Sequence, residues 1–381
     1  MGSRRGALGT ALFAAFFFTL VSSCLAESPR RPAAVTEGVP EAAAAASPPE
    51  AGDTPGSAAP AATAPGAAAS PPEAGRLRCA VMPENPRPGE PVTVWIAPSL
   101  STAWEETGAA FSAVLFTAAG KRLSAAPFFA VPQAQGEPPL LAAVLAVPST
   151  SENGFAHIQI GGGGETLIEI PVIIAERTFV SEEIPLNQSL TDIRTAPDPR
   201  KTAESQRLWA ILSKTGTDIY GSGNFIPPVG STRRTSFFGD RRVFVYSNGG
   251  RDTSIHAGVD YGVPTGTPVA ACGPGRVVLA SSRIVTGNSV VIEHLPGLYS
   301  LYYHLDTIET AEGALVAQGD RIGLSGATGL ATGPHLHWEI RVSGENTDPD
   351  SFIGRPVLDK DAVLARISDN TLWNLTVSER R

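Results

Sequence analysis

The chain has 381 residues, of which 42% are hydrophobic, and it carries 39 glycines and 33 prolines. This length exceeds one ordinary domain, and so much glycine and proline favours β-structure with many turns, plus unfolded sequence, over a helical protein. The formal net charge of -8 and the sequence pI of about 5.4 exclude the basic footprint that nucleic-acid-binding proteins need.

Residues 1–23 have the pattern of a secretory signal peptide. Arg4 and Arg5 precede an apolar run from Ala7 to Val21, which is too short for a stable transmembrane helix. Small residues follow and end at Cys24. The sequence therefore predicts an exported protein.

The end of this segment, Val-Ser-Ser-Cys24, resembles a bacterial lipobox, in which the cysteine becomes lipidated. Ordinary cleavage near Ala26, without an anchor, is the alternative. Leu25 is not the aspartate that retains many lipoproteins in an inner membrane, which favours the outer membrane. We therefore expect a protein of the cell envelope or periplasm that is lipid-anchored through Cys24.

Residues 24–75 are mostly Ala, Pro, Glu, Ser and Gly without an aromatic residue, which predicts a disordered tether. Residues 76–178 contain five or more short strand patterns, among them Val92–Ile96, Ser112–Thr117 and Leu140–Val147. Strands at this spacing predict an Ig-like β-sandwich domain.

Residues 179–224 are expected to connect two domains through a helix. Asp198 and Pro199 form a cap and first turn, and Leu208, Ile211 and Leu212 form an apolar face, so the helix should run from Pro199 to about Lys214. Residues 225–350 show short β runs broken by glycine, and residues 351–381 form a tail with one weak helical segment. Cys79 and Cys272 fall in different domains, which favours two buried free thiols over a disulfide.

The histidines of the 225–350 segment form a pattern that indicates metal chemistry. The pattern consists of His256 with Asp260, then His304, then His335 with His337. Two imidazoles and one carboxylate can hold a zinc ion and leave a position for water, and two histidines then remain for acid–base work.

The local spacing of these residues makes further predictions. His335 and His337 lie two apart on a strand and should face one cleft while Leu336 packs in the core. His256 and Asp260 are too far apart on a straight strand, which predicts a bend near Gly258. Alternation should place Tyr302 and His304 on one face. Two other histidines, His157 and His294, do not belong to these motifs and are interpreted as structural.

These motifs resemble the M23 (LytM/lysostaphin-type) zinc metallopeptidases. The resemblance rests on His256-Ala-Gly-Val-Asp260, Tyr-His304-Leu and Gly-Pro-His335-Leu-His337-Trp-Glu339, and it covers about residues 235–350. It implies that His256, Asp260 and His337 bind Zn2+, that His304 and His335 are catalytic, and that the substrate is peptidoglycan. The expected fold is mainly β: an N-terminal sandwich, a short connecting helix and an antiparallel β peptidase domain with a groove.

Two other functions remain open at this point. A catalytically inactive M23-like domain could activate a cell-wall amidase, although such domains usually lack one or more of the metal ligands that are all present here. Alternatively, the sandwich could act as an envelope adaptor that binds glycan or protein. The peptide bond that is cleaved cannot be read from the sequence.

Overall fold

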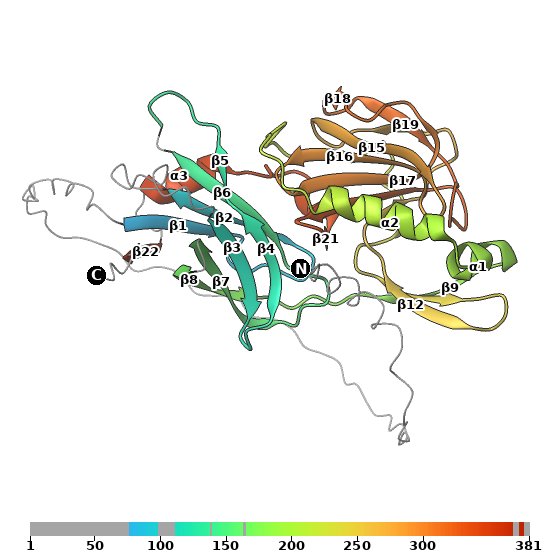
Figure 1. Ribbon diagram of the computed structural model, residues 1–381, viewed down its shortest axis with the longest axis horizontal. Coiled ribbons are helices and arrows are strands. Elements are labelled where there is room, and N and C mark those ends of the chain that lie inside the picture. Colours follow the sequence, from blue (N-terminus) through green and yellow to red (C-terminus); the bar gives the residue numbers. More distant parts are fainter. Residues whose placement is uncertain (1–75, 98–110, 138, 163–164, 369–372, 377–381) are drawn as a thin grey trace, which may run out of the picture. The chain divides into compact units, whose positions relative to one another are not determined.

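This computed structural model describes residues 76–97, 111–137, 139–162, 165–368 and 373–376 (Figure 1). The predicted signal peptide (1–23), Cys24 and the tether (24–75) lie outside the described residues. Within the described ranges, no helix combines the length and apolar character that crossing a bilayer requires. The prediction of a mainly β fold is confirmed, because two β-rich regions account for most of the described chain.

The N-terminal region is a sandwich of two antiparallel sheets. A five-stranded sheet has the order β22-β1-β2-β6-β5, and a four-stranded sheet has the order β4-β3-β7-β8. Alternating apolar residues of both sheets, such as Val94, Leu115 and Ile158, form the core between them. The strands are β1 (Arg76–Met82), β2 (Pro91–Ala97), β3 (Ser112–Thr117), β4 (Arg122–Pro127), β5 (Phe129–Val131), β6 (Leu140–Ala146), β7 (Gly154–Gly162) and β8 (Glu165–Ile174).

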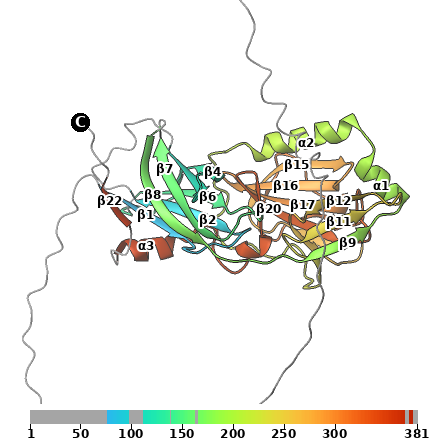
Figure 2. The same ribbon diagram turned by 90° about the horizontal axis from the view of Figure 1, so that it is seen from below.

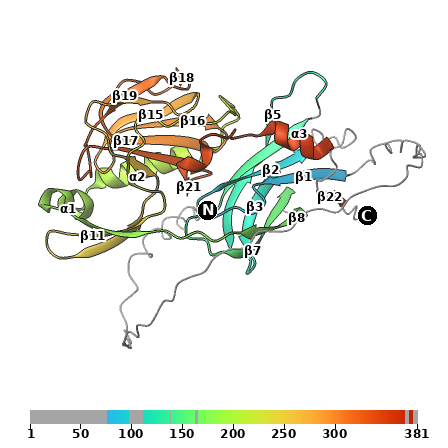
Figure 3. The same cartoon turned by 180° about the vertical axis from the view of Figure 1, so that it is seen from behind.

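The C-terminal tail returns to this sandwich. Strand β22 (Trp373–Thr376) pairs antiparallel with β1, and the helix α3 (Lys360–Ser368) lies next to β1 (Figure 3). The buried side chain of Val363 on α3 joins the same apolar cluster as Val144 on the outer face of β6. The described part of the segment 351–381, which was expected as a tail with one weak helix, therefore adds an edge strand to a sheet of the N-terminal domain.

The connecting segment contains more structure than the single predicted helix. The strand β9 (Ser181–Pro185) is followed by α1 (Gln188–Thr195) and α2 (Pro199–Leu212), which are capped by the side chains of Asn187 and Asp198. The helix α2 covers one face of the strands β15 to β17, where Leu212 packs against Leu279 and Val291 (Figure 2). β9 was not predicted, because its sequence Ser-Glu-Glu-Ile-Pro is short and charged.

The C-terminal region is built around a ten-stranded sheet. Its main path has the order β10-β13-β20-β17-β16-β15-β18, while β14, β19 and β21 pair at its sides. Its strands are β10 (Arg234–Ser236), β13 (Val259–Tyr261), β14 (Pro268–Ala270), β15 (Gly275–Arg283), β16 (Gly287–Leu295), β17 (Leu298–Ile308), β18 (Leu315–Val316), β19 (Arg321–Ser325), β20 (Leu336–Val342) and β21 (Glu345–Thr347), followed by the 3-10 helix η1 (Pro349–Phe352).

A separate three-stranded sheet joins the connector to this region. The strand β11 (Arg241–Val245) pairs antiparallel with β12 (Arg251–Ile255) and parallel with β9. The chain leaves β12 directly into His256, so this small sheet borders the residues that the sequence singles out.

Candidate metal centre

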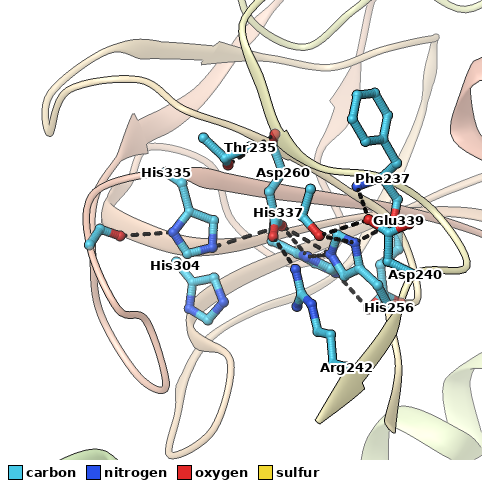
Figure 4. A network of polar contacts seen from close by, with 12 residues as sticks. Thr235, Phe237, Asp240, Arg242, His256, Asp260, His304, His335, His337 and Glu339 are labelled. Atoms are coloured by element: carbon cyan, nitrogen blue, oxygen red, sulfur yellow. Dashed lines mark hydrogen bonds and ion pairs between the residues drawn. The ribbon is translucent and has the colours of Figure 1, made fainter. Parts of the chain in front are cut away.

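The three predicted metal ligands converge at one point. His256 follows β12, Asp260 lies on β13 and His337 lies on β20 (Figure 4). Asp260 and His337 are direct cross-strand neighbours, which brings their side chains onto one face. The distances are 3.1 Å from His256 Nε2 to Asp260 Oδ1, 2.7 Å from His337 Nδ1 to that oxygen, and 3.0 Å between the two nitrogens.

A bend brings His256 into this group. The predicted bend is present at Gly258, between the end of β12 and the start of β13. A Cβ atom at Gly258 would lie 2.1 Å from the carbonyl oxygen of Trp338, so a side chain would push β13 away from β20. The glycine therefore permits the close approach that sets His256 beside Asp260.

Hydrogen bonds fix which nitrogen each ligand histidine presents. His256 Nδ1–H donates to the Phe237 carbonyl at 2.7 Å, and His337 Nε2–H donates to Glu339 Oε1 at 3.0 Å. These bonds leave His256 Nε2 and His337 Nδ1 as the electron-pair donors that face Asp260. Such outer partners are characteristic of metal-ligating histidines.

The charge state of the cluster suits a cation. Burial alone would raise the pKa of Asp260, but His337 and His256 hold it well below its usual range. For His337, burial by itself would lower the pKa. The Asp260 and Glu339 carboxylates outweigh this effect and raise the pKa of His337 to about 9. A metal ion would take the place of the His337 proton. His256, Asp260 and His337 are 2%, 5% and 7% exposed, so the cluster is largely shielded from solvent.

His304 and His335 line the same pocket, which has a volume of about 270 Å³. Their ring centres are 4.8 Å apart, and His335 Nε2 lies 3.8 Å from Asp260 Oδ1. His304 Nδ1–H donates to the Thr328 carbonyl at 2.7 Å, and His335 Nδ1–H donates to the Gly333 carbonyl at 2.8 Å. Both rings therefore keep Nε2 as an acceptor. Burial lowers the pKa of His304 to about 3, so its ring is neutral near pH 7.

An irregularity in β17 aims His304 at the pocket. His304 has a φ of 61°, which is unusual for a residue other than glycine, and the pairing register of β17 shifts next to it. Tyr303, whose ring stacks on His337, lines the pocket beside His304. The expectation that Tyr302 and His304 share a face is wrong, because Tyr302 points into the core and its hydroxyl accepts from the Cys272 amide.

The histidines interpreted as structural lie elsewhere. His294 is fully buried, and its Nδ1–H donates to the Pro274 carbonyl. His157 stacks on Phe116 in the sandwich. Cys79 and Cys272 are buried free cysteines, so the prediction of two free thiols is confirmed.

Sequence reasoning missed several residues that support the cluster. Arg242 on β11 donates from Nη2 to Asp260 Oδ2 at 2.5 Å (Figure 4), and Ser236 Oγ lies 3.3 Å from His256 Nδ1. Glu339 belongs to the recognised motif, but its contact with His337 was not predicted. Of these residues, only Glu339 could have been predicted from the sequence. It lies two residues after His337 on one strand, so the two side chains share a face.

Comparison with known proteins places this cluster in a family. Residues 254–349, which include all five candidate site residues, match the family described as Peptidase family M23. Peptidoglycan DD-endopeptidase ShyA of Vibrio cholerae serotype O1 is 33% identical over 173 residues, which are 45% of this chain and 40% of that protein. DD-carboxypeptidase/endopeptidase Mpg of Neisseria meningitidis serogroup B is 39% identical over 137 residues, which are 36% of this chain and 31% of that protein.

Among solved structures, a putative peptidase M23 from Pseudomonas aeruginosa is 23% identical and covers 71% of this chain and 95% of its own, with a TM-score of 0.48. The chain spans less than half the length of the two curated relatives. The motifs, the family match over residues 254–349 and the clustering of the three donors agree: the chain contains a domain of peptidase family M23, a family of metallopeptidases.

Proposed function

We propose that this protein is a zinc-dependent endopeptidase that hydrolyses peptide bonds in peptidoglycan stem peptides or cross-links during cell-wall remodelling. The observation that carries the proposal is the convergence of His256, Asp260 and His337 beside two further histidines with open Nε2 atoms. The names of the relatives ShyA and Mpg support the substrate class.

The donor set fits zinc. Two histidine nitrogens and one carboxylate oxygen, separated by 2.7–3.1 Å, match the three-ligand set of catalytic zinc sites. Within the part of the chain that the structure describes, this is the group of His, Cys, Asp and Glu side chains that could hold a metal ion. Bound zinc would supply a Lewis acid that polarises the scissile carbonyl and makes water acidic.

The two remaining histidines would then move protons. A neutral imidazole with an open Nε2 accepts a proton from the attacking water, and His335 is assigned this role because its Nε2 lies 3.8 Å from Asp260 Oδ1. His304 would deliver a proton to the leaving amine. Its neutral ring has an acceptor at Nε2, so it would first take up the proton that His335 removed from the water, across the 4.8 Å between the ring centres, and then donate that proton to the amine nitrogen as the peptide C–N bond breaks.

Digestion of purified sacculi tests this function. Zinc-loaded full-length protein should release peptide fragments in which a new amine and a new carboxylate appear at one bond, as identified by mass spectrometry. Chelator treatment should stop the release, and added zinc should restore it. Intact sacculi together with stoichiometric zinc would contradict the proposed substrate, whereas a protein that purifies without zinc would point to an inactive, activating domain.

We further propose that the mature protein is held in the cell envelope by a lipid on Cys24. The lipobox-like sequence that ends at Cys24 supports this location, and the long tether would provide reach from the membrane. Replacing Cys24 with alanine should shift the protein from the membrane fraction to the soluble periplasmic fraction. Unchanged membrane association would contradict the anchor.

A further inference from the structure

The metal cluster is linked to a strand that lies outside the residues matching family M23. Glu182 lies on β9 of the connecting segment, in parallel register with Arg242 on β11. Arg242 Nε donates to Glu182 Oε1 at 3.1 Å, and Arg242 Nη2 donates to Asp260 Oδ2. One guanidinium therefore joins the carboxylate of the connector to the carboxylate of the metal cluster.

Glu182 reaches the cluster by a second route. Its Oε1 also accepts from Ser236 Oγ at 2.9 Å, which is shorter than the 3.3 Å from that hydroxyl to Asp240 Oδ2. With its hydrogen directed to Glu182, the Ser236 hydroxyl presents a lone pair to His256 Nδ1–H at 3.3 Å. The same carboxylate oxygen thus orients partners of both Asp260 and His256.

The charges explain why the metal cluster would need Glu182. Arg242 places a positive charge beside the carboxylate that would hold a dication, and its side chain is only 17% exposed. Glu182 offsets that charge and holds the guanidinium on Oδ2 of Asp260, which leaves Oδ1 directed at the two histidine nitrogens. Without Glu182, the Arg242 charge would be offset by Asp260 alone, in competition with the metal ion, and the Asp260 carboxylate would lose its fixed orientation.

We propose that Glu182 is a positioning residue for the metal centre, which acts through Arg242 on Asp260 and through Ser236 on His256. This inference rests on the proposed zinc site. It makes the metal affinity of the peptidase domain depend on the connecting segment, because β9 belongs to the segment between the sandwich and the domain.

The neighbouring residue offers a matched control. Glu183 lies on the same strand and pairs with Arg251, but both side chains are at least half exposed and lie on the side of the sheet away from the cluster. Replacing Glu182 or Glu183 with alanine removes one negative charge and one ion pair from adjacent positions. Only the first replacement removes the contacts that lead to Asp260 and His256.

The test measures zinc affinity by competition with a chromophoric chelator on the full chain, without substrate. Glu182→Ala should weaken zinc binding about 10–100-fold, the usual effect of removing a residue that orients a ligand, whereas Glu183→Ala should leave it unchanged. Glu182→Gln, which keeps an acceptor oxygen, should recover part of the affinity. Melting temperatures measured in chelator should be alike for the two alanine variants, while the rise on adding zinc should be smaller for Glu182→Ala.

A second comparison tests the route. Adding Glu182→Ala to a chain that already carries Arg242→Ala and Ser236→Ala should have no further effect on zinc affinity. Equal affinity of Glu182→Ala and Glu183→Ala overturns the proposal whatever their stability, and so does an undiminished effect in the combined variant. Since no turnover is measured, failure of sacculus digestion would leave this result standing.

Discussion

Replacing Asp260 with alanine should weaken metal binding strongly and remove turnover with it. Asp260 Oδ1 is the point to which both histidine nitrogens are directed, so its loss removes the one negative donor of the cluster. Structural zinc sites with four protein ligands have a binding free energy of about 10–16 kcal/mol, so one ligand contributes about 2.5–4 kcal/mol on average, or about 10²–10³-fold in affinity. Peptide release should fall to that of the chelated wild-type protein.

Asp252 provides the control for this variant. It lies on β12, the strand that precedes β13 in the chain, and forms an ion pair with Arg194, much as Asp260 does with Arg242, but it is exposed and does not line the pocket. Asp252→Ala should retain zinc and activity. Wild-type zinc affinity or wild-type digestion in Asp260→Ala would show that the metal is held elsewhere or that the chemistry occurs elsewhere.

Replacing His304 or His335 with alanine should leave zinc bound and slow turnover by about 10²–10⁴-fold, the range for a general acid or base. Neither residue supplies one of the three converging donor atoms, yet both present an open Nε2 to the pocket. The loss should fall on kcat more than on KM, because these rings act on protons that move during the reaction. Initial rates of fragment release, with zinc content measured on the same samples, check this result.

His157→Ala is the matched histidine control, since His157 lies on a sandwich strand and stacks on Phe116. It should have wild-type rates. Full activity in either His304→Ala or His335→Ala would remove that residue from the mechanism, and loss of zinc in either variant would make it a ligand or a ligand-positioning residue.

Much of the fold could be predicted from the sequence because the patterns that specify helices and strands are local. The helix predicted from Pro199 to about Lys214 is α2, which ends at Leu212, and the run Ser112–Thr117 is β3. A capping aspartate and an alternation of apolar residues act over a few neighbours, so they can be read without tertiary context. Strand β9 had no such pattern, because its stability comes from pairing with β11.

At the candidate site, too, some features could be predicted from the sequence and others depend on the fold. The types and order of His256, Asp260, His304, His335 and His337 are properties of the sequence, and they alone indicate metal chemistry. Which atoms would face a bound metal ion was decided by the fold: the Phe237 carbonyl sets the tautomer of His256, and Glu339 sets that of His337. The bulge that turns His304 toward Tyr303 instead of Tyr302 also arises from strand pairing.

The sequence by itself determined which side chains are available as the proposed metal donors, because coordination chemistry depends on the identity of side chains and their spacing within each strand. Only the tertiary structure decided that Glu182, Ser236 and Arg242 support those donors. These three residues come from separate strands, and their contacts exist only because the fold brings β9, β10 and β11 together beside Asp260 and His256. Contacts between distant segments depend on strand register and packing, which no short stretch of sequence encodes.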